Sequence, residues 1–190
     1  MAIGQLDIRP VKIFKVLKRT RRRGKQMHKQ KGFSLIELLI VVAIILIIAA
    51  IAIPNLLRAR IAANESSAAA SVRTIATGEL TYQTAYGGYV TSLDQLGPDT
   101  ANGCTTPSSA NACIIDYQLA HATSTLPKSG YAFTAASAVA LQYFISAVPA
   151  TSGSSGIKNF CAVEDNVVRF DGSAAATDHN DCLKKTAIGN

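Results

Sequence analysis

A long run of apolar residues near the start of the chain is the strongest feature of its hydrophobic pattern. From Phe33 to Ile53 only Ser34 and Glu37 are polar, and the run ends at Pro54. A helix of these 21 residues spans about 32 Å, close to the roughly 30 Å hydrocarbon core of a bilayer. Because the run is apolar on all sides, it predicts a membrane-spanning helix rather than one face of a soluble helix.

After Pro54 the pattern changes to apolar positions at helical spacing, separated by polar residues. A proline inside a helix removes one backbone donor, so a break or bend of the helix is expected there. The stretch 54–86 predicts an amphipathic helix that continues the apolar one and ends at Gly87-Gly88. Its predicted apolar stripe consists of Leu57, Ile61, Ala68, Val72, Ile75 and either Leu80 or Tyr82. The polar residues expected on its other faces are Arg58, Arg60, Glu65, Ser66, Arg73 and Glu79.

The rest of the chain reads as a turn-rich segment followed by strands. Residues 87–112 are rich in Gly, Pro, Asn, Asp, Ser and Thr, and this segment is called the αβ-loop below. We expect it to pack Tyr89, Val90, Leu93 and Leu96 on the helix. Strand-like runs follow at 113–120, 130–137 and 140–148, with a turn at Ala138-Val139, and 160–170 reads as a hairpin turning at 164–166. This order predicts an α+β fold with an antiparallel sheet of three to five strands.

The net charge of +7 is unevenly distributed. Residues 1–32 carry a net charge of +10, and the rest of the chain carries −3. Lys and Arg beside a membrane span remain in the cytoplasm, so the helix is expected to enter the membrane with its N-terminus inside. The alternative is a nucleic-acid-binding arm at 1–32, but no basic patch with interleaved aromatics follows it, and no nucleic-acid partner is predicted.

The residues Lys31-Gly32-Phe33-Ser34-Leu35-Ile36-Glu37, followed by the apolar run and Pro54, closely resemble the N-terminus of type IV prepilins and type II secretion pseudopilins. The resemblance implies that a prepilin peptidase cuts between Gly32 and Phe33 and N-methylates Phe33. It also implies that Glu37 pairs with the N-terminal amine of a neighbouring subunit. Leu46 stands where the family commonly has Gly. In assembled pili of the family the helix is often unwound between that Gly and the Pro, and Leu46 puts this unwinding in doubt. Pro54 then remains as the expected helix break.

The resemblance also implies the pilin fold, in which a long N-terminal helix packs on a C-terminal antiparallel sheet. Its expected parts are a cytoplasmic leader at 1–32, a transmembrane and filament-core helix at 33–53, its amphipathic half at 54–86, the αβ-loop at 87–112 and a sheet-containing head at 113–190. A start at Met27 gives a leader of six residues, typical of many type IV pilins, so we expect the true start there.

Four cysteines lie in the predicted head, at 104, 113, 161 and 182. An exported head reaches an oxidising compartment where disulfides persist, and four cysteines allow three pairings. We favour sequential pairing, Cys104–Cys113 and Cys161–Cys182, because the second pair then resembles the disulfide-bounded C-terminal region of many pilins. A metal site is the alternative, but C-x-x-C spacing is lacking.

Oxygen-bearing side chains gather near the C-terminus, at Asp171, Asp178, Asn180 and Asp181. Calcium takes six to eight oxygen ligands, and major pseudopilins hold calcium in this part of their fold, so these residues are weak calcium candidates. A solvated polar turn is the ordinary interpretation, and we expect no cofactor. The remaining histidines, His121 and His179, have no nucleophile motif beside them, so an enzyme is not predicted.

These features predict the major-type subunit of a type IV pilus. Its expected partners are other copies of itself, a prepilin peptidase, the inner-membrane assembly platform and membrane lipid. The head is expected to be periplasmic before assembly and extracellular in the pilus. One alternative is a pseudopilin of a type II secretion system in a periplasmic pseudopilus. Another is a membrane-anchored adhesin or sensor that does not polymerise.

Overall fold

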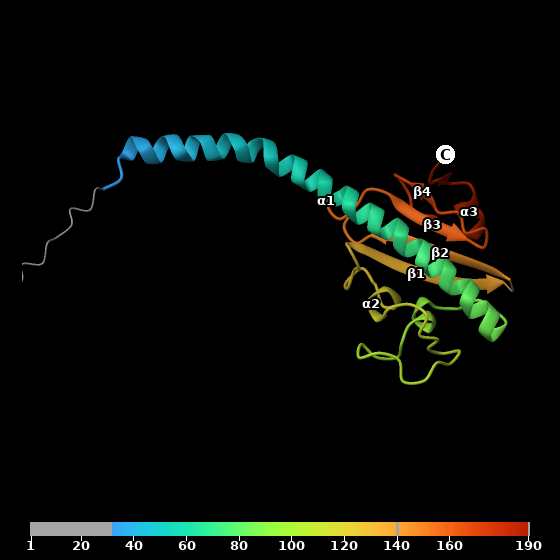
Figure 1. Ribbon diagram of the computed structural model, residues 1–190. Helices are drawn as coiled ribbons and strands as arrows, with labels where there is room; N and C mark the ends of the chain where they lie inside the picture. Colours follow the sequence, from blue (N-terminus) through green and yellow to red (C-terminus); the bar gives the residue numbers. More distant parts are fainter. Residues whose placement is uncertain (1–31, 140, 190) are drawn as a thin grey trace, which may run out of the picture. The chain divides into compact units, whose positions relative to one another are not determined.

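The computed structural model describes residues 32–139 and 141–189. The expected leader, apart from Gly32, and the start at Met27 therefore lie outside the described residues. The chain divides into two units, one up to Val42 and one from Ala43 onward. Described residues of the first unit are the short segment 32–34 and the start of helix α1, which as a whole spans Leu35–Tyr86. The second unit contains the rest of α1 and a sheet-containing head (Figure 1).

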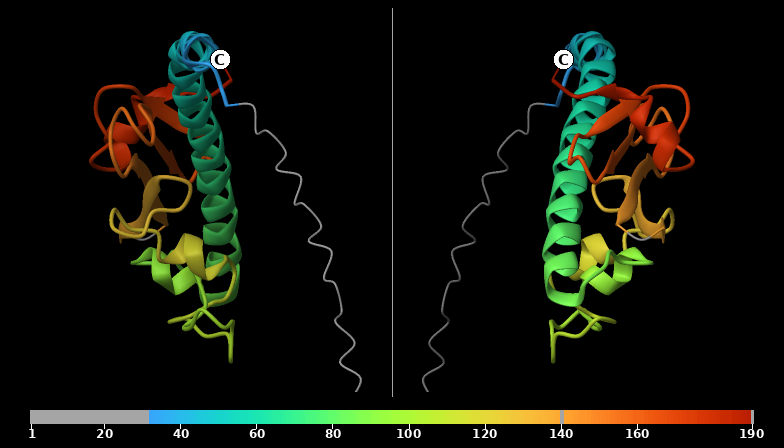
Figure 2. Two further views of the ribbon diagram at one scale, coloured as in Figure 1. Left: turned by 90° about the vertical axis from the view of Figure 1, so that its left-hand side faces the viewer. Right: turned by 90° about the vertical axis from the view of Figure 1, so that its right-hand side faces the viewer.

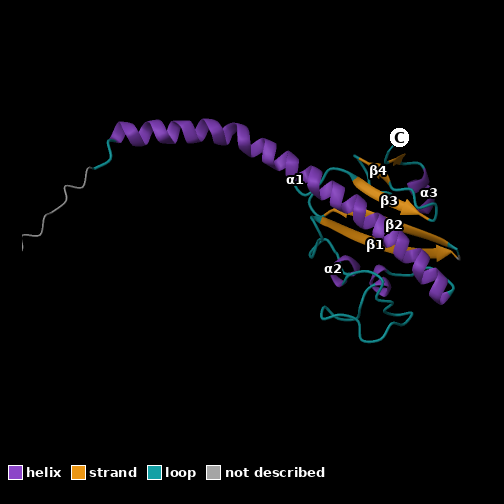
Figure 3. Cartoon of the chain, in the orientation of Figure 1, coloured by secondary structure: helices purple, strands orange, loops and turns teal. Residues whose placement is uncertain are grey.

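The head is built on one antiparallel sheet with the strand order β1-β2-β3-β4-β5 (Figure 3). Its strands are β1 (Tyr131–Val139), β2 (Gln142–Pro149), β3 (Asn159–Val163), β4 (Arg169–Asp171) and β5 (Thr186–Ala187). Because each strand pairs antiparallel with the next one along the chain, no crossover connection is needed. The predicted α+β class is confirmed, with five strands.

The hydrophobic core lies between α1 and the sheet. On α1, Ala68, Val72 and Ile75 are fully buried, and Tyr82 is nearly so. They pack in one cluster with sheet residues that include Phe133, Tyr143, Ile145 and Phe160. The predicted stripe is correct over this stretch, with Tyr82 rather than the alternative Leu80 on the buried side, but Leu57 is exposed. Leu57 comes before the part of α1 that packs in the core, and Leu80 follows Glu79, which takes the core-facing position instead.

The αβ-loop is ordered against α1, as predicted. Val90, Leu93 and Leu96 are buried, and Tyr89 packs against the core. Leu93–Leu96 form a short 3-10 helix, η1, whose capping box is made by Ser92 and Gln95. The capping box satisfies free backbone donors at the helix start, so this polar stretch holds a fixed conformation.

Two predictions about strands are wrong. Residues 113–120 form no strand: they end in the short helix α2, Tyr117–Ala120. Asp116 caps this helix by accepting a hydrogen bond from the Leu119 N–H at 3.0 Å, an arrangement that favours a helix start over a strand. The turn expected at Ala138-Val139 also comes later, since β1 includes both residues.

The predicted hairpin at 160–170 is confirmed. β3 and β4 pair in register, with Phe160 opposite Phe170, and the chain turns between them at 164–166. Asn166 adopts the left-handed conformation, with φ of 58°, and its N–H donates to the Val163 carbonyl at 2.9 Å. Asn tolerates that conformation better than most residues. After β4 the chain forms a third helix, α3 (His179–Leu183), which the hydrophobic pattern does not indicate.

Candidate functional site

The segment expected to be processed lies just before α1. Gly32 and Phe33 belong to no helix or strand, and the Phe33 side chain is 81% exposed. The space around Gly32 is open, since no other atom lies within 4 Å of the Cβ position that a substituted residue would have. A peptide bond between these two residues is therefore reachable by a peptidase.

Glu37 lies in the first turn of α1, two residues after the helix begins at Leu35. A carboxylate at this end of a helix is favoured by the unsatisfied backbone N–H groups and the helix dipole. The helix begins with a hydrogen bond from the Leu38 N–H to the Ser34 carbonyl at 3.2 Å. Glu37 thus sits on a rigid element, close in sequence to the amine that cleavage before Phe33 would create.

The first half of α1 presents apolar side chains to its surroundings on every side. Its most apolar 18-residue window has a mean hydropathy of 3.3, none of the window is buried, and α1 is long and apolar enough to cross a membrane. Soluble monomers rarely expose continuous apolar patches of more than a few hundred Å². These exposed side chains are Leu35, Ile36, Leu38, Leu39, Ile40, Val41, Val42, Ile44, Ile45, Leu46, Ile47, Ile48, Ile51, Ile53, Leu56 and Leu57.

The helix is not interrupted at Pro54, and the bend expected there stays a prediction. Pro54 lies inside α1, and the helix continues on both sides of it. Pro54 has no backbone N–H to donate, but the residues on either side keep their N–H groups, so the helix loses only one hydrogen-bond donor. Leu46, where the family commonly has Gly, has a high helix propensity and is also helical here.

The four cysteines form two disulfides, Cys104–Cys113 and Cys161–Cys182. These are the two sequential pairs. The first closes the end of the αβ-loop, where Cys104 is exposed. The second joins β3 to α3 and is buried, with 2% exposure of Cys161 and none of Cys182. One bridge therefore shapes a surface loop, and the other fixes the C-terminal region to the sheet.

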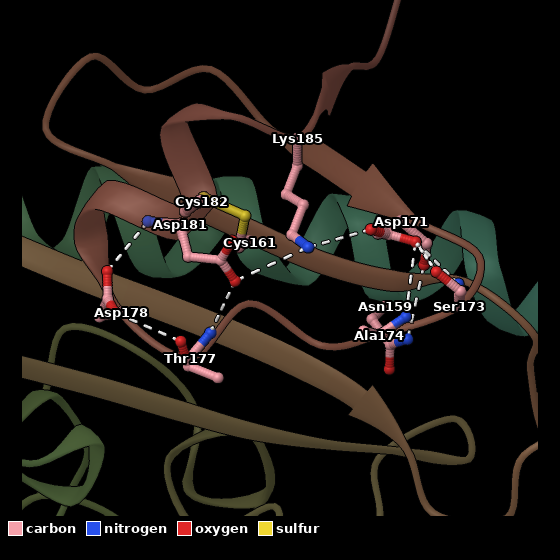
Figure 4. Close-up of polar contacts among 10 residues, drawn as sticks. All are labelled: Asn159, Cys161, Asp171, Ser173, Ala174, Thr177, Asp178, Asp181, Cys182 and Lys185. Atoms are coloured by element: carbon pink, nitrogen blue, oxygen red, sulfur yellow. Dashed lines mark hydrogen bonds and ion pairs between the residues drawn. A yellow bond between two sulfur atoms is a disulfide. The ribbon is translucent and has the colours of Figure 1, made fainter.

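The three calcium candidates do not converge on a common point (Figure 4). The Lys185 ammonium lies between two of them, 3.0 Å from Asp171 Oδ2 and 3.6 Å from Asp181 Oδ2. Asp178 instead caps α3, accepting from the Asp181 N–H at 2.9 Å. Within 32–139 and 141–189, no group of three or more His, Cys, Asp or Glu side chains could hold a metal ion. A lysine thus occupies the position where a bound cation would bridge Asp171 and Asp181.

Hydrogen bonds and charge also fix the protonation of this cluster. The Ser173 N–H, and after it the Lys185 ammonium, hold the pKa of Asp171 well below its usual range. The Asp181 N–H lowers the pKa of Asp178. In turn, hydrogen bonding to Asp171 raises the pKa of Lys185. Asp171, Asp178 and Lys185 therefore stay charged near neutral pH, and the lysine neutralises part of the negative charge.

Glu79 is a buried carboxyl, and the expectation that it lies away from the apolar stripe is wrong. Its side chain is completely buried on the core-facing side of α1. One oxygen, Oε2, accepts from the Val90 N–H at 3.1 Å, and Oε1 has no hydrogen-bond partner. Burial raises the pKa of Glu79 to about 7, against the opposing effect of the Val90 N–H. Its helical spacing from Ile75 and Tyr82 is the signal that could have placed it on the buried face.

The two histidines of the head lie apart. His179 Nε2 contacts both carboxylate oxygens of Glu164, at 2.7 and 2.8 Å. His121 stacks on Tyr117 with ring centroids 4.1 Å apart. Both contacts stabilise local structure, at the hairpin turn and at α2 respectively.

Comparison with known proteins finds similarity in the N-terminal region. Residues 27–53 match the family described as the prokaryotic N-terminal methylation motif. Forty residues are 65% identical to the type IV wide pilus major component PilA4 of Thermus thermophilus. The aligned stretch is 21% of this chain and 30% of that relative. The family match therefore bears on the apolar helix and on the segment just before it.

Proposed function

Because the chain belongs to the type IV pilin family, we propose that it is the structural, major-type subunit of a type IV pilus. The observation that carries this proposal is the first half of α1, which exposes apolar side chains all round and has one carboxylate in its first turn. Such a surface needs lipid before assembly and the same helix of other copies afterwards. The structural role requires no catalytic site in this chain.

The proposed sequence of events begins in the inner membrane. The basic residues of 1–32 keep that end in the cytoplasm, and the head lies on the far side. A prepilin peptidase then cuts between Gly32 and Phe33 and methylates the new amine. The assembly platform moves the subunit from lipid into the filament, where the apolar helices cover one another.

Glu37 gives this assembly its register. A carboxylate in an apolar bundle is costly unless an opposite charge pairs with it, and losing one partner leaves the other stranded. The amine of Phe33 from a neighbouring copy is the cation that cleavage supplies. We therefore assign Glu37 to pair with that amine and so fix the axial position of each new subunit.

A pseudopilin of a type II secretion system is the second candidate, since both classes share the N-terminal motif. The position of Lys185 between Asp171 and Asp181 favours the pilin. A pseudopilin that depends on calcium needs carboxylates free to bind the ion, and here two of the three candidates already share an ammonium group. The two disulfides of the head agree with the same choice. A non-polymerising adhesin or sensor is the third possibility, and it gives no role to Glu37.

Mass spectrometry of fibres sheared from the cell surface tests the proposal. We expect the chain to be abundant there and to begin with an N-methylated Phe33. Recovery only from membranes, with a short periplasmic filament, would support the pseudopilin. A chain that still carries residues 28–32 in its working form would contradict the proposal as a whole.

A further inference from the structure

Charged side chains that lack a partner are distributed unevenly in the described residues from 54 onward. Most charged groups there are paired within the chain, for example Lys128 with Asp116 at 2.8 Å and Arg169 with Asp165 at 2.6 Å. Six have neither a hydrogen bond nor an ion pair to their side chains. The cations among them are Arg58, Arg60, Arg73 and Lys184, and the anions are Asp94 and Asp99.

Two of the free arginines border a groove between α1 and the end of the sheet. The groove consists of two adjoining hollows of about 310 and 430 Å³, which share Ala62, Glu65, Lys158 and Phe170 as lining residues. Arg58 lines the first hollow and Arg73 the second. The lining also includes Ile61, Ile157 and Ile188. The groove is therefore lined by apolar side chains and by the Glu65–Lys158 ion pair, and it has two arginines without a partner along its α1 side.

The two free aspartates belong to the αβ-loop. Asp94 is exposed on η1, and Asp99 begins a stretch of twelve consecutive exposed residues, 99–110, called the exposed loop below. This loop is held in shape: Cys104 is bonded to Cys113, and the Tyr82 hydroxyl donates to the Ser109 carbonyl at 2.6 Å. A preordered loop loses less conformational entropy when it binds than a flexible one.

We propose that the groove receives the exposed loop of a second copy of this chain, and that Asp94 and Asp99 of that copy form ion pairs with Arg58 and Arg73. The inference rests on the proposed function, because it requires copies to assemble in parallel. Charge complementarity identifies the occupant: the only carboxylates without a partner in residues 54–139 and 141–189 are these two.

The geometry of the head fits a filament. The exposed loop and β5 lie toward opposite ends of the head (Figure 2). A contact between two different surfaces of the same subunit is heterologous and continues from copy to copy without closing. Such a contact fixes the axial position of neighbouring heads relative to each other. It acts in addition to the packing of the apolar helices, which fixes the axial position of each subunit.

The positions of the contacting residues along α1 give the axial displacement between the two copies. Leu96 of η1 packs beside Gly78, and its Cδ1 atom lies 3.5 Å from the position that a Cβ atom on Gly78 would take. Gly78 follows Arg73 by five residues and Arg58 by twenty, or about 8 and 30 Å along the helix. A parallel copy shifted by about 8 to 30 Å toward the N-terminal end of α1 therefore brings its η1 level with the arginines.

The position of Arg73 distinguishes the proposed contact between copies from binding to lipid. Arg58 follows Pro54 by four residues, within reach of phosphate groups at the membrane surface. Arg73 lies twenty residues beyond Ile53, about 30 Å farther along the helix and well past the headgroup layer. A role for Arg73 in assembly therefore points to protein rather than to lipid.

Charge reversal in the full-length chain tests the contact. The variants are Arg58→Glu with Arg73→Glu, Asp94→Arg with Asp99→Arg, and all four changes together. We expect each pair of reversals to lower the yield of sheared fibres at least about tenfold, because like charges then face each other across the contact. The fourfold variant should recover to within about threefold of the unaltered chain, because it restores opposite charges.

Arg60→Glu is the matched control. Arg60 is two residues from Arg58, about 200° around the helix and away from the groove. Reversal of Asp94 and Asp99 should not repair any defect that Arg60→Glu causes. Non-reducing gels of membrane fractions check that each variant folds with both disulfides.

The outcomes are distinct. Normal fibre yield from either pair of reversals, or no recovery in the fourfold variant, overturns the docking contact. An arginine defect that the aspartate changes cannot repair, accompanied by weaker membrane retention, assigns the arginines to lipid instead. Absence of the unaltered chain from sheared fibres contradicts the proposed function and not this contact alone.

Discussion

Glu79 makes the stability of the head depend on pH. Its pKa is raised from 4.5 to about 7, chiefly by burial, so the folded chain binds its proton more tightly than the unfolded chain. The resulting stabilisation is complete below pH 4.5 and is lost as the pH rises through 7. We expect Glu79 to lower the free energy of unfolding by at most about 3 kcal/mol over this range. Denaturant unfolding at several pH values measures it.

The Glu79→Gln variant isolates this effect from other titrating groups. Several aspartates, among them Asp165 and Asp171, have lowered pKa values and act in the opposite direction at lower pH. Because Gln does not titrate, the stability of the variant relative to the unaltered chain should rise between pH 5 and 8. Parallel pH curves for the two proteins would contradict the assignment.

Helical spacing alone can place Glu79 on the core-facing side of α1, but it cannot show that the carboxyl is buried. Its spacing from Ile75 and Tyr82 is local information, and its charge argues for an exposed face. The Val90 N–H donates a hydrogen bond to the Glu79 carboxylate, and it reaches the carboxylate only because the chain folds back after Gly87-Gly88. Burial of a polar group depends on such returning segments, which helical periodicity does not describe.

We expect Lys185 to make the head independent of calcium. Its ammonium already lies between Asp171 and Asp181, so millimolar Ca²⁺ should leave the thermal unfolding temperature of the unaltered chain unchanged. Lys185→Ala should slightly reduce stability and should make unfolding sensitive to Ca²⁺. Lys184→Ala, which removes a neighbouring lysine without an ion pair, is the control. Clear stabilisation of the unaltered chain by Ca²⁺ would favour the pseudopilin.

At the scale of elements, the two disulfides should differ in accessibility. Cys104 is exposed, whereas Cys161 and Cys182 are almost fully buried between β3 and α3. A thiolate must reach the sulfur to reduce a disulfide, so mild reductant should open Cys104–Cys113 first. Alkylation of the freed cysteines followed by mass spectrometry measures the order. Simultaneous reduction of both bridges in the folded chain would contradict it.

The two bridges should also differ in their contribution to stability. Cys161–Cys182 spans 21 residues and Cys104–Cys113 spans nine, so the loop-entropy account gives the longer bridge the larger effect, about 3 kcal/mol. Replacing both Cys161 and Cys182 by Ala should lower the unfolding temperature more than replacing Cys104 and Cys113. Equal losses would contradict the larger contribution that the loop-entropy account gives to Cys161–Cys182.

Gly97 allows the end of η1 to approach the helix α2 closely. A Cβ atom at this position would lie only 2.3 Å from the Cβ of Ala120, so a side chain there forces the two elements apart. Gly97→Ala should destabilise the head by about 1–3 kcal/mol, measured by denaturant unfolding. Gly103→Ala, in the exposed loop, has open space around it but a φ of 119°, and it serves as a comparison for backbone strain alone. Equal stability of Gly97→Ala and the unaltered chain would contradict this packing.

Local signals predicted some elements well and others poorly. The hairpin at 160–170 followed from two short β-branched runs around a polar turn, and the structure contains it. Residues 113–120 carried a similar apolar run, yet Asp116 directs them into α2. The end strand β5 has only two residues and gains its place by pairing with β4. Short elements of this kind depend on tertiary partners, so sequence patterns identify them poorly.

At the scale of the whole molecule, removal of residues 1–32 would reverse the sign of the charge. The complete chain carries +7, and residues 33–190 carry −3. In the proposed assembly the positive charge serves the membrane stage, and the processed subunit carries the small net negative charge of residues 33–190. The apolar run could be recognised from sequence, because it is continuous along the chain. The groove and its free arginines could not, since strands and α1 meet there only in the folded head.

The pairing of Glu37 with a neighbouring Phe33 amine is the central claim, and one comparison tests it most directly. Sheared fibre is quantified from cells that produce either the unaltered chain or Glu37→Val, with the membrane-bound chain measured in parallel. Loss of one partner of a buried ion pair costs about 3–5 kcal/mol, so we expect Glu37→Val to reduce fibre yield at least about a hundredfold while its membrane level is maintained. Normal fibres from Glu37→Val would contradict the account.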